Sequence, residues 1–145
     1  MNNLKPKTLF IFFFMLLFLQ LALLLFYMYN KASYTPDEIL SYGLSNSTKS
    51  LFLYPHPWKR NQKSTNFNDW IPGRTIEEYV TVQENERFSY KNTWQNQEQD
   101  THPPLYYLIL HTICSFFPET FSKWQGFSIN ILCFVLTQIL LFTIG

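Results

Sequence analysis

The stretch that decides the fold is Asp100-Thr101-His102-Pro103-Pro104-Leu105-Tyr106-Tyr107-Leu108-Ile109-Leu110-His111. It joins a long polar segment to an apolar one, and two consecutive prolines stand at the junction. Pro104 suits the first position of a helix, because the N–H that proline lacks would have no intrahelical partner there. Pro103 keeps the residue before it extended. We therefore expect a helix that begins at Pro104, with the polar residues Asp100 and His102 just before it.

The composition points to a membrane protein rather than to a nucleic-acid-binding one. The chain has 145 residues, a length that allows one domain at most. Apolar residues make up 47% of it and aromatic residues 19%. The mean hydropathy is close to zero, because the apolar residues are concentrated in blocks around a polar middle. The formal net charge of +1 argues against a nucleic-acid partner. Cys114 and Cys133 lie in apolar segments and lack Cys-x-x-Cys spacing, which predicts inert buried thiols rather than a disulfide or metal site.

The N-terminal apolar segment is long enough to cross a bilayer. Residues 1–8 are polar and carry Lys5 and Lys7, and residues 9–29 are almost wholly apolar. At about 1.5 Å per residue, this segment is roughly 30 Å long, the thickness of a bilayer core. The alternative is a cleaved signal peptide, which would have a shorter apolar core and a small-residue cleavage site after it. Because the apolar run is long and no such cleavage site follows it, we expect an uncleaved transmembrane helix. The two lysines before it favour an N-terminus in the cytoplasm.

Residues 30–103 are expected to form one long extracytoplasmic loop. Its first part contains Thr35, followed by Pro36 and then by Glu38 three residues after the threonine. This pattern is a capping box with proline at the first helical position. It predicts a helix over residues 36–46.

The second part of the loop is less regular. Residues 75–78 repeat the capping pattern and predict another short helix. Residues 80–82 and 87–90 are candidates for the two strands of a small hairpin around residues 84–86.

The C-terminal part predicts one short helix and one membrane helix. Residues 104–117 are too few to span a bilayer comfortably, which favours an interfacial or re-entrant helix. Residues 121–145 are long and apolar enough for a second transmembrane helix. Asn130, Thr137 and Gln138 interrupt it, and such residues often face other helices. The fold class expected is therefore mainly α and integral to the membrane, with two transmembrane helices flanking the loop and both termini in the cytoplasm.

Two pairs of polar residues are candidates for chemistry. A carboxylate just outside a membrane helix, at Asp37 or Glu38, could take a proton from a hydroxyl or hold a divalent metal. Both also have structural explanations, since Glu38 completes the capping box and Asp37 complements the helix dipole. His102, beside Asp100, could bind a phosphate when protonated or a metal when neutral, or only bond to loop backbone. His111 is expected to be a packing residue on the helix.

Taken together, the motifs carry a family resemblance. They are Asp37-Glu38-Ile39-Leu40-Ser41-Tyr42-Gly43-Leu44 and the stretch from Asp100 to His111, followed by Ser122-Lys123-Trp124 and Asn130. In this order they resemble the N-terminal part of the polytopic GT-C glycosyltransferases of the protein-mannosyltransferase (family 39) type. Within that family the chain looks most like a bacterial, Firmicutes-type branch.

The resemblance implies transfer of a sugar from a polyprenyl-phosphate carrier to an acceptor on the outer face of the cell membrane. It implies that Asp37 is the catalytic base and that Glu38 supports it. Asp100, His102 and Tyr106 would lie near the lipid phosphate or the sugar. The metal requirement, the sugar and the acceptor stay open.

The resemblance also implies that more of the enzyme exists. Family members have many more membrane helices, so we expect a fragment of a GT-C fold that is inactive alone and pairs with the remaining helices of a longer or split protein. The alternative is a small two-span membrane protein whose outer loop is a binding or assembly module.

Overall fold

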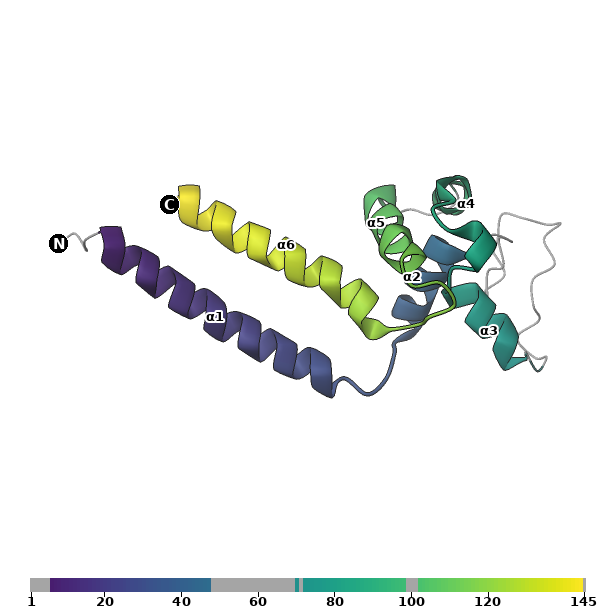
Figure 1. Cartoon of the computed structure of the whole chain (residues 1–145), viewed down its shortest axis with the longest axis horizontal. Coiled ribbons are helices and arrows are strands. Elements are labelled where there is room, and N and C mark those ends of the chain that lie inside the picture. Colours follow the sequence, from purple (N-terminus) through teal and green to yellow (C-terminus); the bar gives the residue numbers. More distant parts are fainter. Residues whose placement is uncertain (1–5, 48–69, 71, 99–101, 145) are drawn as a thin grey trace. The chain divides into compact units, whose positions relative to one another are not determined.

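The computed structural model describes residues 6–47, 70, 72–98 and 102–144, and this part of the chain is mainly helical without a β-strand (Figure 1). The chain divides into two units. The first comprises residues 1–33 and 126–145, and the second residues 34–125.

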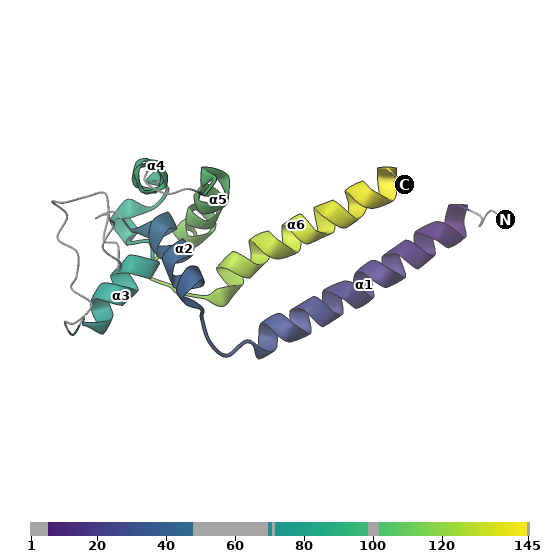
Figure 2. The same cartoon turned by 180° about the vertical axis from the view of Figure 1, so that it is seen from behind.

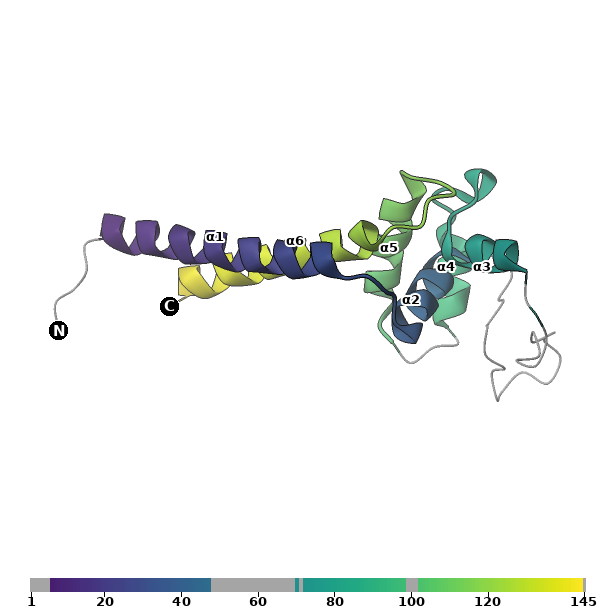
Figure 3. The ribbon, with the colours of Figure 1, turned by 90° about the horizontal axis from the view of Figure 1, so that it is seen from below.

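The first unit contains two long apolar helices, α1 (Pro6–Asn30) and all but the first three residues of α6 (Lys123–Ile144). They lie side by side and run in opposite directions (Figure 3). The ring of Phe13 stacks on that of Phe142, with 4.2 Å between the ring centroids. Both helices are long and apolar enough to cross a membrane, in the places where the sequence predicts transmembrane helices.

The second unit is built around a central helix. Its elements are α2 (Pro36–Asn46), α3 (Gly73–Val80), a 3₁₀ turn (Glu84–Glu86), α4 (Tyr90–Gln97) and α5 (Pro104–Ser115). Helix α2 packs against α3, α4 and α5 (Figure 2). The core therefore forms around α2, the element that follows α1 in the chain.

Helix α2 has the predicted bounds, because its start is fixed by the capping box. Its face towards α3 requires a glycine. A Cβ atom on Gly43 would overlap the ring of Tyr79, which lies directly on the α2 backbone at this position. Tyr79 itself is buried, so the close approach of α2 and α3 depends on Gly43.

Helix α4 is polar, and it is held to α2 by hydrogen bonds. The last carbonyl groups of any helix lack intrahelical partners. Here Thr93 Oγ1 donates to the carbonyl of Ser45 at 2.8 Å, and Asn96 Nδ2 donates to the carbonyls of Leu44 at 3.1 Å and Ser47 at 2.8 Å. Thr93 and Asn96 are buried. The side chains of α4 therefore satisfy the C-terminal end of α2.

The prediction of a hairpin over residues 80–90 is wrong. Val80 ends α3, residues 84–86 form the 3₁₀ turn, and Tyr90 begins α4. The carbonyls that a partner strand would use are already bonded: that of Val80 accepts from Asn46 Nδ2 and that of Val82 from the N–H of Glu119, both at 2.8 Å. Phe88 has a φ of 57°, which is incompatible with a strand.

Two other predicted elements need smaller corrections. The helix expected from Thr75 begins earlier, at Gly73, so Thr75 lies inside α3 instead of capping it. Helix α5 starts at Pro104 as predicted but ends at Ser115 rather than at residue 117. At this end Ser115 Oγ accepts from the N–H of Phe88 at 3.0 Å and donates to the carbonyl of His111 at 2.7 Å. This serine supports the strained backbone at Phe88.

Aromatic contacts join the start of the second unit to its end. The ring of Tyr34 stacks on that of Phe121, with 4.4 Å between centroids, and Tyr42 meets the same ring edge-on at 4.9 Å. The Tyr42 hydroxyl donates to the carbonyl of Ser122 at 2.6 Å. The first and last residues of this unit are therefore held together.

Candidate functional site

The first turn of α2 uses one of its two acidic side chains for capping. Glu38 Oε2 accepts from the backbone N–H of Thr35 at 2.7 Å, and the N–H of Glu38 donates to Thr35 Oγ1 at 3.4 Å. These are the two reciprocal bonds of a capping box. The Glu38 carboxylate therefore has a structural role.

Asp37, its neighbour, differs in its surroundings. Its side chain is exposed, and within the described residues no hydrogen bond or ion pair engages its carboxylate. The carboxylate lies in the first turn of α2. Of the two predicted catalytic residues, Asp37 is the one whose oxygens are available to a substrate.

The first turn of α5 lies near the first turn of α2. Burial raises the pKa of the Tyr106 phenol, and the negative charge of Glu38 raises that pKa further, with a smaller contribution from Cys114. Helices α2 and α5, which carry Glu38 and Tyr106, pack against each other. With a raised pKa, Tyr106 keeps its proton at neutral pH and can act as a hydrogen-bond donor.

Further contacts show that α2 and α5 run in the same direction. At their C-terminal ends His111 lies against the backbone of Ser45, and Cys114 lies beside the side chain of Asn46. The partner on α5 moves forward along the chain as the partner on α2 does, from Tyr106 beside Glu38 to Cys114 beside Asn46, which is the pattern of helices that run in the same direction. The two N-termini, with their partial positive charges, therefore lie at the same end of the second unit.

His102 stands at the start of α5 but outside its first turn. It is exposed, and its ring lies 6.4 Å from that of Tyr107, centroid to centroid. The predicted phosphate or sugar contacts at His102 and Tyr106 are thus at the same helix start. Asp100, the remaining predicted site residue, lies outside the described residues.

The residues offer limited support for a bound metal. In residues 6–47, 70, 72–98 and 102–144, no three His, Cys, Asp or Glu side chains gather as a metal site would require. Glu38, one of the two carboxylates considered for a metal, is already engaged with Thr35.

His111 is the buried packing residue that the sequence predicts, with 2% of its surface exposed. Its ring meets that of Tyr90 edge-on, with 5.7 Å between centroids. Burial lowers the pKa of its imidazole, and the adjacent Ser45 backbone opposes this only partly.

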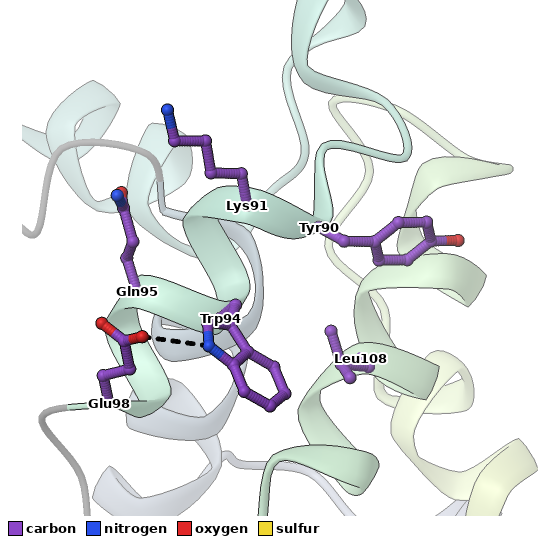
Figure 4. Close-up of a pocket in the computed structure, with 6 residues that line it drawn as sticks. All are labelled: Tyr90, Lys91, Trp94, Gln95, Glu98 and Leu108. Carbon is purple, nitrogen blue, oxygen red and sulfur yellow. Dashed lines mark hydrogen bonds between the residues drawn. The ribbon is translucent and has the colours of Figure 1, made fainter.

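A groove that the sequence analysis missed lies between α4 and α5. It has a volume of about 560 Å³ and is lined by Tyr90, Lys91, Trp94, Gln95, Glu98 and Leu108 (Figure 4). The signal for it is the spacing of Tyr90 and Trp94, four residues apart on a polar helix. The incorrect assignment of Tyr90 to a strand concealed this spacing.

No family model, curated protein or solved structure matches this chain.

Proposed function

We propose that the chain is part of a membrane glycosyltransferase, which moves a sugar from a polyprenyl-phosphate carrier to an acceptor at the outer face of the cell membrane. The observation that carries the proposal is the different state of the two acidic residues in α2. Glu38 is bonded to Thr35, whereas Asp37 is exposed and has no such partner in the described part of the chain. A general base must reach its substrate, so Asp37 is the base.

Each group at this end of the unit has a role in the transfer. Asp37 takes the proton of the acceptor hydroxyl as the hydroxyl oxygen attacks the anomeric carbon. The bond between that carbon and the phosphate oxygen breaks, and the lipid phosphate leaves with the electron pair. The neighbouring N-termini of α2 and α5 favour a phosphate. Tyr106 donates a hydrogen bond to it, and His102 contributes a positive charge when it is protonated.

The proposed orientation puts the N-terminus in the cytoplasm and the second unit outside the cell. It rests on Lys5 and Lys7, which precede the first membrane helix. Further membrane helices complete the donor site in this proposal. The exposed amide of Asn130 on α6 supports their existence, because an amide in a membrane helix favours a polar partner.

The alternative is a two-span membrane protein whose outer loop is a binding or assembly module. The observation that favours it is the groove between α4 and α5, which needs no further helices to form. The same experiment separates the two functions.

The test replaces the chromosomal copy with Asp37→Asn in the cell that makes the protein. Transfer of radiolabelled sugar from polyprenyl phosphate is then measured in isolated membranes. Loss of a general base predicts a fall of about 10²- to 10⁴-fold in the transfer rate, with an unchanged amount of protein in the membrane. The matched control is Glu77→Gln, which neutralises an exposed carboxylate on α3 and should leave the rate unchanged.

Undiminished transfer in the Asp37→Asn membranes would remove Asp37 as the base. If complete deletion of the chain also leaves every sugar transfer intact, the proposal fails and the binding module is favoured.

A further inference from the structure

Helix α4 carries two large aromatic side chains, Tyr90 and Trp94, that the rest of the second unit covers only in part. One side of the helix is fixed to α2 through Thr93 and Asn96. The other side presents Tyr90 and Trp94, whose side chains remain 42% and 51% exposed. Exposed aromatic rings on an anchored helix are typical of a binding surface.

Both rings are held in place before any ligand binds. Trp94 Nε1 donates to Glu98 Oε1 at 3.0 Å, which fixes the indole along the helix (Figure 4). The Tyr90 hydroxyl is hydrogen-bonded to Thr112 Oγ1 on α5 at 3.1 Å. Because the polar ends of both rings are already bonded, their faces are what the groove offers. A site preorganised in this way loses little side-chain entropy on binding.

Polar side chains that can bond to hydroxyl groups also line the groove. Gln95 supplies an amide, Lys91 an ammonium group, and the second oxygen of Glu98 a carboxylate acceptor. The ring of a pyranose sugar has an apolar face of C–H groups and a rim of hydroxyls, which complements an aromatic face surrounded by such donors and acceptors. The opposite charges of Lys91 and Glu98 balance, which favours a neutral ligand over an anion.

A lipid surface fits these residues less well. A tryptophan at a membrane interface has one polar end, its indole N–H, for the headgroup region. In Trp94 that N–H is bonded to Glu98, so it is already used within α4.

We propose that the groove between α4 and α5 binds a neutral pyranose sugar, with Trp94 as the stacking platform. This binding is independent of sugar transfer by Asp37, because α4 is attached to the C-terminal end of α2, whereas Asp37 lies in its first turn. The groove would serve to hold an acceptor or a cell-surface glycan.

The test uses the full chain in lipid nanodiscs and three probes: methyl α-mannopyranoside, methyl β-glucopyranoside and methyl α-galactopyranoside. Binding is measured by saturation-transfer-difference NMR. We expect a saturable signal from at least one glycoside, with a dissociation constant in the millimolar range. Trp94→Ala should weaken this binding about tenfold. Trp70→Ala, which removes a fully exposed tryptophan outside the groove, is the matched control and should leave binding unchanged.

A second variant separates a loss of binding from a loss of folding. Gln95→Ala keeps both aromatic rings and should weaken the same glycoside about threefold, with an unchanged thermal unfolding midpoint. Binding that is equal in the native chain and both groove variants would overturn the proposal, as would the absence of saturable binding by all three probes. Strong quenching of Trp94 fluorescence by brominated nanodisc lipids, in a variant with Trp58, Trp70 and Trp124 changed to Phe, would assign the groove to the bilayer instead.

Discussion

Two buried side chains on α5, His111 and Cys114, face the C-terminal half of α2. Burial lowers the pKa of the His111 imidazole and raises the pKa of the Cys114 thiol to about 11. At neutral pH both side chains are therefore uncharged. The thiol is correspondingly unreactive, in agreement with the inert role predicted for it.

The lowered pKa of His111 gives the stability of the second unit a dependence on pH. The unfolded chain takes up a proton near pH 6.5, the ordinary histidine value, whereas the folded chain does so only at lower pH. The contribution of His111 to the free energy of unfolding is therefore fully present above pH 6.5. It falls as the pH decreases below this value, by at most about 1.4 kcal/mol per pH unit, until the folded form is protonated too.

Thermal unfolding of the full chain in detergent between pH 7.5 and 5.0 measures this effect. The midpoint should fall towards pH 5.0 in the native chain, and the decrease should be smaller in His111→Leu. His102→Gln, which removes an exposed histidine, should retain the full decrease. An identical pH profile in the native chain and in His111→Leu would contradict the prediction.

At the scale of single residues, local signals in the sequence were sufficient for several features. The capping box at Thr35 and Glu38 predicted the start of α2, and Pro104 predicted the start of α5, because both effects depend only on neighbouring backbone groups. The capping box also predicted that Glu38, rather than Asp37, is bonded to Thr35. The exposure of Asp37 could not be predicted, because it depends on which other elements pack around the start of α2.

At the scale of elements, the attachment of α4 to α2 is the contact most sensitive to mutation. Asn96→Ala leaves the buried carbonyls of Leu44 and Ser47 without their partner. We expect a loss of about 1–3 kcal/mol in the free energy of unfolding, measured by denaturant titration of the full chain. Gln95→Ala, one residue earlier and exposed, should change it by less than about 0.5 kcal/mol. Equal losses in the two variants would show that Asn96 does not cap α2.

This attachment also explains why α4 was not predicted. Hydrophobic periodicity identifies a helix by its apolar face, but the buried face of α4 consists of Thr93, Asn96 and Gln97. These residues are buried because they bond to the carbonyls at the C-terminal end of α2. Those carbonyls lie about fifty residues earlier in the sequence, so the local sequence of α4 does not reveal them. The parallel packing of α2 and α5, and the groove beside α4, were missed for the same reason.

At the scale of the whole molecule, α6, one of the two helices long and apolar enough to cross a membrane, exposes a polar group. The amide of Asn130 is exposed on α6, and no described residue bonds to it. Thr137, on the same side of the helix, differs because its hydroxyl donates to the carbonyl of Cys133 at 2.8 Å. An interhelical hydrogen bond in a membrane is worth about 0.6–1.7 kcal/mol. Asn130→Leu should therefore weaken the association of α6 with other membrane helices about 3- to 18-fold.

The prediction that both thiols are buried is wrong for Cys133, which is exposed on α6. Association can be followed through this thiol, by the yield of disulfide-linked complexes in native membranes. Thr137→Val is the control, because the hydroxyl it removes is bonded within its own helix. If Asn130→Leu and Thr137→Val give the native yield, Asn130 faces lipid and the prediction is wrong.

The central position of α2 has a consequence for biosynthesis. Helix α2 leaves the ribosome before each helix that packs against it, and about 60 residues separate it from α5. At synthesis rates of about 5–20 residues per second, α2 waits roughly 3–12 s for its last partner. During this time the backbone of α2 at Gly43 and the carbonyls at the C-terminal end of α2 are not yet packed against α3 and α4. They are therefore accessible to chaperones and proteases. Variants that weaken α4 or α5 should consequently reduce the yield of the protein in the cell more than they reduce the stability of the molecules that have folded.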